Sequence, residues 1–112
     1  MTIFEKIAAR EIQADIVYET DEFLAFRDIH AKAPIHILII PKRCISRIGE
    51  AENADAELLG RMLVASKEIA KDAGVFESGY RLVINHGPDA GESVPHLHIH
   101  LLGGRAFGWP PG

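Results

Sequence analysis

Three histidines, His96, His98 and His100, alternate with aliphatic residues near the end of the chain. Successive side chains of a β-strand point to opposite faces, so this period of two predicts a strand with the three imidazoles on one face. The intervening aliphatic side chains would be buried on the other face. Gly103 and Gly104 would end the strand.

Imidazoles in such a row could hold an anion or act as nucleophiles. A strand rises about 3.3 Å per residue, which places His96 and His100 roughly 13 Å apart, too far to ligate one zinc ion. A phosphate suits the row better, since one neutral ring can attack while protonated neighbours hold the anion. The preceding loop supplies Gly91, which permits close approach of the backbone to an anion, and the hydroxyl of Ser93. The alternative is a surface patch or an adventitious metal site.

The composition indicates an ordinary globular domain. With 112 residues, one domain over 1–112 is expected, and 47% hydrophobic with 25% charged residues is typical of such a domain. The net charge of −4 argues against nucleic acid as a partner. A single cysteine and the lack of a leader or long apolar run favour a cytoplasmic protein without membrane contact.

Hydrophobic periodicity predicts an α+β fold. Helices are expected over 4–10, with Thr2 as N-cap, and over 55–73, with Gly74 as the stop. Besides the histidine strand, further strands are expected over 16–19, 22–26, 36–41 and 79–85. The continuous apolar run after His36 is typical of a central strand buried on both faces, and His36 itself is expected to be a hydrogen-bonded structural residue. About five antiparallel strands would therefore pack against one long helix and one short N-terminal helix.

The pattern His96-x-His98-x-His100-Leu101-Leu102 resembles the signature of the histidine triad (HIT) superfamily. The surroundings resemble its Hint-type branch of purine nucleoside phosphoramidases. The matching stretches are 3–7, 24–29, 33–36, 39–42, 91–94 and 109–112. The resemblance implies a HIT-like fold and a homodimer in which two subunits pair to extend the sheet.

The resemblance also implies an activity. This is hydrolysis of purine nucleoside 5′-phosphoramidates, of the adenosine phosphoramidate or AMP-lysine type, through a covalent nucleotidyl-histidine intermediate. His98 would attack phosphorus, His96 and His100 would hold and neutralise the phosphoryl oxygens, and Ser93 would help to protonate the departing amine. No metal or cofactor is expected.

Roles in substrate binding are implied for further residues. Asp28 would accept hydrogen bonds from the ribose hydroxyls, Ile29 would pack on the base, and Asn85 would contact the phosphate region. Trp109, in the terminal segment, would lie near the partner's site and tune substrate choice. The other implied contacts are Phe4 and Ile7, which would wall the purine pocket, together with Phe26, Gly91, Glu92, Ser93, Val94, His98 and His100.

Cys44 departs from the Hint-type pattern, which usually has a further histidine at that position. A thiol is a weaker donor and is normally neutral, so the pH profile could differ. Buried packing is its expected role, although cysteine can also ligate zinc. The alternative functions are dinucleoside polyphosphate hydrolysis or nucleotidyl transfer by the same histidines, or a non-catalytic nucleotide- or zinc-binding regulatory module.

Overall fold

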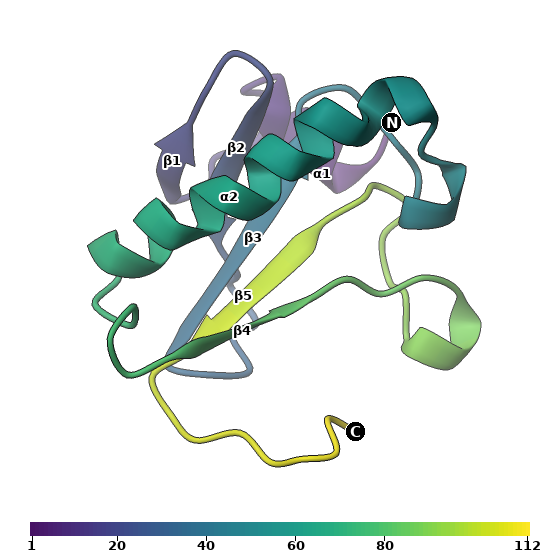
Figure 1. Cartoon of the computed structure of the whole chain (residues 1–112). Helices are drawn as coiled ribbons and strands as arrows, with labels where there is room; N and C mark the ends of the chain where they lie inside the picture. The colour runs from purple at the N-terminus through teal and green to yellow at the C-terminus, as the bar shows by residue number, and fades with distance from the viewer.

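The computed structural model describes residues 1–112 and contains one five-stranded antiparallel sheet with a helix on each face (Figure 1). The elements are α1 (Ile3–Ala8), β1 (Ile16–Glu19), β2 (Phe23–Arg27), β3 (Ile35–Pro41), α2 (Ala56–Asp72), β4 (Tyr80–Val83) and β5 (Ile99–Gly103). The strand order is β1-β2-β3-β5-β4, which places β5 between β3 and β4. The expected fold class is confirmed. Neither helix combines the length and the apolar character that crossing a membrane requires.

The alternating side chains of β3 divide the core into two layers. Ile37 and Ile39 pack with Met62 of α2 on one face of the sheet. Leu38 points to the other face, where it packs with Phe4 of α1. The long helix therefore covers one face, and the short helix covers part of the other. The open remainder of that second face carries the histidines.

The short helix α1 begins at a capping box. Thr2 Oγ1 accepts a hydrogen bond from the Glu5 backbone N–H (3.1 Å), and the Glu5 carboxylate accepts one from the Thr2 N–H (2.9 Å). Thr2 is therefore the N-cap, as predicted. The helix ends at Ala8, before the predicted Arg10, because Arg10 has a left-handed φ of 64°.

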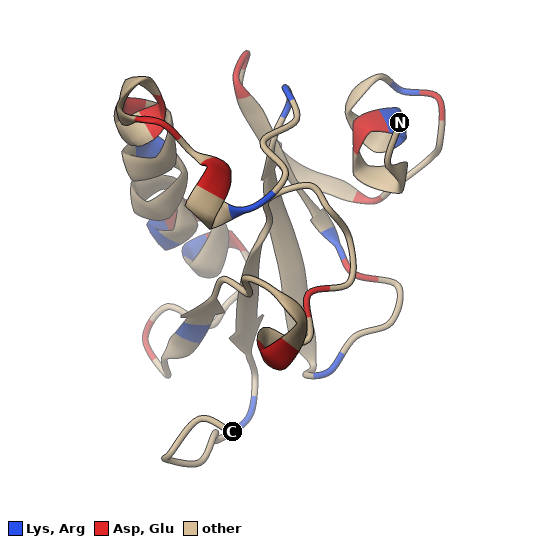
Figure 2. Cartoon of the chain, turned by 90° about the vertical axis from the view of Figure 1, so that its right-hand side faces the viewer, with Lys and Arg blue, Asp and Glu red and all other residues tan.

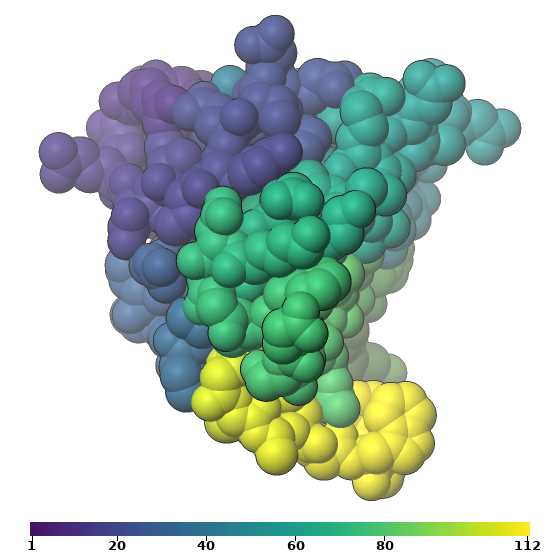
Figure 3. Space-filling model, turned by 60° about the vertical axis from the view of Figure 1, so that its left-hand side comes forward, coloured from purple at the N-terminus to yellow at the C-terminus, as the bar shows by residue number.

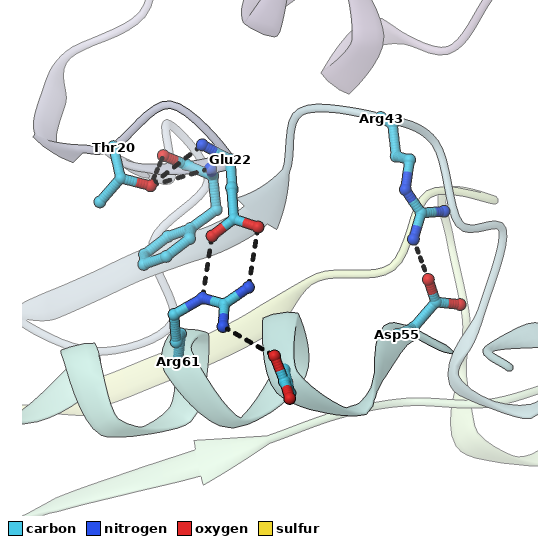
Figure 4. Close-up of polar contacts among 7 residues, drawn as sticks. Thr20, Glu22, Arg43, Asp55 and Arg61 are labelled. Carbon is cyan, nitrogen blue, oxygen red and sulfur yellow. Dashed lines mark hydrogen bonds and ion pairs between the residues drawn. The ribbon is translucent and has the colours of Figure 1, made fainter. Parts of the chain in front are cut away.

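Two arginines tie the long helix α2 to neighbouring segments (Figure 4). Arg61 donates two hydrogen bonds of 2.8 Å to the Glu22 carboxylate, and Arg43 donates to Asp55 just before the helix begins. The Arg61–Glu22 pair is about half exposed, so its contribution to stability is at most about 1 kcal/mol. Burial of one face of α2 is the larger contribution.

The strand β5 begins later than predicted, at Ile99 and not at His96. His96 and His98 lie in the irregular segment just before it, where the Leu97 N–H donates to the Ile45 carbonyl (2.6 Å) and not to β3. Gly103 is the last residue of the strand. A Cβ there would lie 3.0 Å from the Val75 side chain, so the position has little room for a side chain.

The chain beyond β5 forms a projecting ridge at one end of the molecule (yellow in Figure 3). Arg81 of β4 donates to the Gly108 carbonyl (2.9 Å), and its guanidinium lies over the Phe107 ring. Trp109 is 83% exposed. Acidic and basic residues are interspersed over the face shown in Figure 2.

We expect the buried face of α2 to dominate its stability. Met62 is fully buried and its neighbour Leu63 is 42% exposed, so the two form a matched pair. Met62→Ala should lower the free energy of unfolding by about 2–5 kcal/mol, because it leaves a cavity. Leu63→Ala should change it by about 0.5 kcal/mol or less. Urea denaturation measures both, and equal losses would contradict this packing.

Candidate active site

A pocket of about 430 Å³ opens on the face of the sheet that carries the histidines. This volume is in the range of small-molecule sites. Apolar side chains of α1 and β2 form one side, and polar side chains from β3, β5 and the adjoining loops form the other. The predicted site residues that line it are Phe4, Ile7, Phe26, Asp28, Ile29, Ser93, Val94, His98 and His100.

His98, the central histidine, is oriented by the backbone of its neighbour. Its Nδ1–H donates to the carbonyl oxygen of His96 at 2.7 Å. A carbonyl oxygen can only accept, so Nδ1 carries the hydrogen and Nε2 keeps a free lone pair. The Phe4 ring lies edge-on at 5.0 Å between centroids and restricts the imidazole further. The ring is therefore held in the tautomer that can attack through Nε2.

His96 does not share the pocket, in contrast to the predicted row of three. Its side chain is fully buried and is not part of the pocket lining. Its Nε2–H donates to the Pro41 carbonyl (2.8 Å), and its Nδ1 lies 3.3 Å from Thr2 Oγ1. The expectation that His96 holds a phosphoryl oxygen is therefore wrong for this geometry. Its contribution is the carbonyl that orients His98.

His36, which the sequence indicated only as a structural residue, extends the site on the other side. The Lys32 backbone N–H donates to His36 Nδ1 (3.0 Å), so this nitrogen carries no hydrogen. His36 then donates from Nε2 to His100 Nδ1 (2.9 Å). His100 must consequently carry its hydrogen on Nε2, which remains as the donor of a ring that lines the pocket. Sequence alone could not pair two histidines from different strands.

The pKa values of the histidines beside His98 are lowered, which favours neutral rings in the chain without a ligand. Burial, and then repulsion from His98 and His36, lower the pKa of His100 to about 4. Burial also lowers the pKa of His96 and of His36. The site therefore offers oriented N–H donors and not a row of cations.

Asp28 and Ile29 lie at the pocket side of the turn after β2. One oxygen of Asp28 accepts from the His30 N–H (2.9 Å), and the other lies 3.5 Å from His36 Nε2. Asp28 is a partly exposed acceptor at the pocket, and Ile29, 89% exposed, offers an uncovered apolar surface. Both positions fit the ribose and base contacts expected for them.

Glu92 braces the loop before the histidines and does not face the pocket. It accepts hydrogen bonds from Arg47 (2.8 Å) and from the Gly87 N–H (3.0 Å). The Arg47 guanidinium, together with the Gly87 N–H, lowers the pKa of Glu92 to about 2. This ion pair holds the loop that carries Ser93, so Glu92 is better described as a positioning residue.

Three other predicted contacts are also absent from the pocket lining of the single chain. These are Asn85, Gly91 and Trp109. Gly91 has a left-handed φ of 77° and ends the short 3₁₀ turn before Ser93, so its role in the chain is conformational. Trp109 lies in the exposed terminal segment.

Two separate groups of three side chains each place their potential metal-ligand atoms within 4.8 Å of one another. One of the two groups lies in the pocket. This group comprises Asp28, His36 and His100. The hydrogen on His36 Nε2 occupies the space between the two rings, and its position is fixed by the Lys32 N–H. An ion here would need His36 to give up that bond and change tautomer, so the group is a poor metal site.

The second group contains Cys44, which is exposed and not buried as expected. Its partners are Glu5 and His96, and none of the three lines the pocket. The Cys44 thiol makes one weak contact, to the Pro95 carbonyl at 3.6 Å.

Residues 9–107 match the HIT domain, and the chain belongs to the HIT family. It is 58% identical over 111 residues to an uncharacterised HIT-like protein of Synechococcus elongatus, covering 99% of this chain and 96% of that protein. It is 51% identical over 113 residues to the 14 kDa zinc-binding protein of Zea mays, covering 99% of this chain and 88% of that protein.

Solved structures of HIT family proteins are similar to this chain over nearly its whole length. A HIT family hydrolase from Legionella pneumophila covers the whole of both chains with a TM-score of 0.96 and 48% identity. A histidine triad nucleotide-binding protein from Candida albicans has a TM-score of 0.83 and 29% identity, covering 98% of this chain and 83% of that one.

We predict the tautomers of the pocket histidines from these hydrogen bonds. At pH 7, His98 should carry a hydrogen on Nδ1 and His100 should carry its hydrogen on Nε2, and the His100 ring should be neutral. Long-range ¹H–¹⁵N correlation spectra of the labelled protein distinguish the two tautomers and the imidazolium. An imidazolium signal for His100 at pH 7 would contradict the hydrogen-bond chain through His36.

We also predict a pH dependence of stability. His100 has a pKa of about 4 in the folded chain, below the value of about 6.5 expected when unfolded. Between these values the unfolded chain binds more protons, so the free energy of unfolding should fall as the pH decreases from 6.5. His100→Gln should make this fall shallower between pH 6.5 and 5, and urea denaturation measures it. The exposed His30→Gln is the control, and identical slopes for both variants would refute the prediction.

Proposed function

We propose that this chain hydrolyses purine nucleoside 5′-phosphoramidates to the nucleoside monophosphate and an amine. The observation that carries the proposal is the orientation of His98, whose hydrogen on Nδ1 leaves Nε2 free as a nucleophile at the pocket. Relatives described as a HIT family hydrolase and as a nucleotide-binding protein support the same class of activity.

Substrate binding would use the two sides of the pocket. The purine would lie among apolar side chains, between Phe4 and Ile7 of α1 and the exposed Ile29. Asp28, an acceptor, would receive hydrogen bonds from the ribose hydroxyls. The 5′-phosphoryl group would then lie toward His98.

In the first step, His98 Nε2 would attack phosphorus. A P–N bond to the imidazole forms while the P–N bond to the amine breaks. The amine leaves with a proton supplied by Ser93, directly or through a triad histidine. His100 Nε2–H would donate to a phosphoryl oxygen, where oriented dipoles stabilise the developing charge.

In the second step, water would attack the nucleotidyl-histidine. The new P–O bond forms as the bond from phosphorus to Nε2 breaks, which restores His98 and releases the monophosphate. The proton that the water loses returns to Ser93, by the reverse of the route used in the first step. The carbonyl of His96 acts in both steps as a positioning group, since it keeps the hydrogen on Nδ1. Neither step uses a metal ion.

We also propose a homodimer in which the sheet extends across β4. This strand has a neighbour on one side only, β5, and it contacts the terminal segment through Arg81 and Gly108. The largely exposed Trp109 would then face the partner, close to its pocket.

The nucleophile gives the most direct test of the proposed activity. His98→Ala should reduce kcat for adenosine phosphoramidate by about 10⁴-fold or more, because it removes the covalent route. Binding of AMP and the thermal unfolding midpoint should be retained. A chelator should leave wild-type turnover unchanged.

Substrate comparison with diadenosine polyphosphate separates the alternatives. Faster turnover of the polyphosphate would favour dinucleoside polyphosphate hydrolysis by the same histidines. Binding of AMP with no turnover of either compound by the wild-type chain would instead favour a non-catalytic nucleotide-binding module. Undiminished turnover of the phosphoramidate by His98→Ala would exclude the mechanism.

A further inference from the structure

We propose that the segment 45–49 positions Ser93 and thereby determines how well the site expels a poor leaving group such as an alkylamine. The inference rests on the proposed function, in which Ser93 supplies the proton that the departing amine needs. The segment follows β3 and contacts the chain before β5, which carries Ser93 and the histidines. Every second residue of the segment, Ile45, Arg47 and Gly49, makes one of these contacts.

The first contact lies beside the nucleophile. The Ile45 carbonyl accepts a hydrogen bond from the Leu97 N–H at 2.6 Å. Leu97 lies in the chain between His96, whose carbonyl orients the nucleophile, and His98, which is the nucleophile itself. One end of the segment 45–49 is therefore fixed relative to the attacking nitrogen.

The second contact is an ion pair directly before Ser93. Arg47 Nε donates to one oxygen of the Glu92 carboxylate (2.9 Å), and Nη2 donates to the other (2.8 Å). The same carboxylate accepts from the Gly87 N–H (3.0 Å). A pair with two parallel hydrogen bonds fixes geometry as well as contributing energy. The Glu92 side chain is only 11% exposed, so water competes less for this pair than for an ordinary surface pair.

The third contact lies at the start of the same loop. The Gly49 N–H donates to His86 Nδ1 at 3.1 Å. The imidazole lies so close to Gly49 that any side chain at this residue would collide with it. The loop 87–91 is therefore held at its start through His86 and at its end through Glu92.

Ser93 depends on these contacts because it is exposed where it lines the pocket, so packing restrains it little. Its position follows from the backbone that continues from Glu92. Since the segment 45–49 also holds Leu97, it sets the place of the proton donor relative to His98. A displacement of a reacting group by about 1 Å can cost about 100-fold in rate.

Two kinds of leaving group need Ser93 to different extents. When the P–N bond of an alkylamine conjugate breaks, the nitrogen takes the electron pair and a proton from Ser93. When the P–O bond of a p-nitrophenyl ester breaks, the phenolate keeps the electron pair and leaves without a proton. A general acid contributes about 10²–10⁴-fold, and here only to the first of these reactions. A displaced Ser93 would therefore slow the amine conjugate selectively.

A comparison of these two conjugates of AMP tests the inference. The measured quantity is kcat/KM, which includes the steps up to departure of the leaving group. Arg47→Ala should lower it by about tenfold or more for the alkylamine conjugate and by about threefold or less for the p-nitrophenyl ester. Glu92→Gln keeps an acceptor for the Gly87 N–H and removes the charge of the pair, so it should show the same selectivity. His86→Ala should do so as well.

Arg61→Ala is the matched control. Arg61 also donates two hydrogen bonds to a glutamate, Glu22, but neither residue lines the pocket. This variant should leave the ratio of the two kcat/KM values at the wild-type value. The thermal unfolding midpoints of all variants, measured in parallel, separate a displaced Ser93 from loss of the fold.

Equal losses for both conjugates in folded Arg47→Ala and Glu92→Gln, or no loss for either, would overturn the inference and leave the proposed function intact. So would a selective loss that Arg61→Ala shows equally. A wild-type chain that does not turn over the alkylamine conjugate would instead contradict the proposed function, and the inference with it.

Discussion

The hydrogen bond from His98 Nδ1 to the His96 carbonyl determines which nitrogen of the central imidazole can react. Because the carbonyl has no hydrogen to give, the lone pair must remain on Nε2. The bond depends on the path of the chain just before β5. Two hydrogen bonds hold that path. The Leu97 N–H donates to the Ile45 carbonyl, and His96 Nε2–H donates to the Pro41 carbonyl. The reactive nitrogen is thus set by backbone geometry, and His96 contributes from the interior.

The register of the sheet determines the hydrogen-bond partner of the second pocket histidine, His100. His100 pairs with Leu38 of β3, which puts His36 two residues away on the same face. The hydrogen-bond series from the Lys32 N–H through His36 leaves His100 neutral, with its hydrogen on Nε2. Fixed dipoles of this kind stabilise developing charge without having to reorganise. The site would therefore stabilise negative charge through the fixed direction of its N–H dipoles more than through a net positive charge.

Local patterns predicted most of the fold, and distant contacts account for what they missed. The apolar run of β3 and the helical period of α2 are local signals, and both elements formed where expected. The alternation of histidines singled out His98, which lines the pocket, but could not show that His96 turns inward. Its partner Pro41 is 55 residues away in the chain. The position of Glu92 likewise depends on a distant contact, because its carboxylate pairs with Arg47, 45 residues earlier in the chain.

A crystal structure with a bound purine nucleoside monophosphate would test the central claim most directly. His98 Nε2 should lie about 3–3.5 Å from phosphorus, on the side opposite the position of the leaving group. His100 Nε2 should donate to a phosphoryl oxygen. His96 should remain buried, with its hydrogen bond to the Pro41 carbonyl intact. A phosphate bound by His96, or a His98 ring whose Nε2 points away from phosphorus, would contradict this assignment.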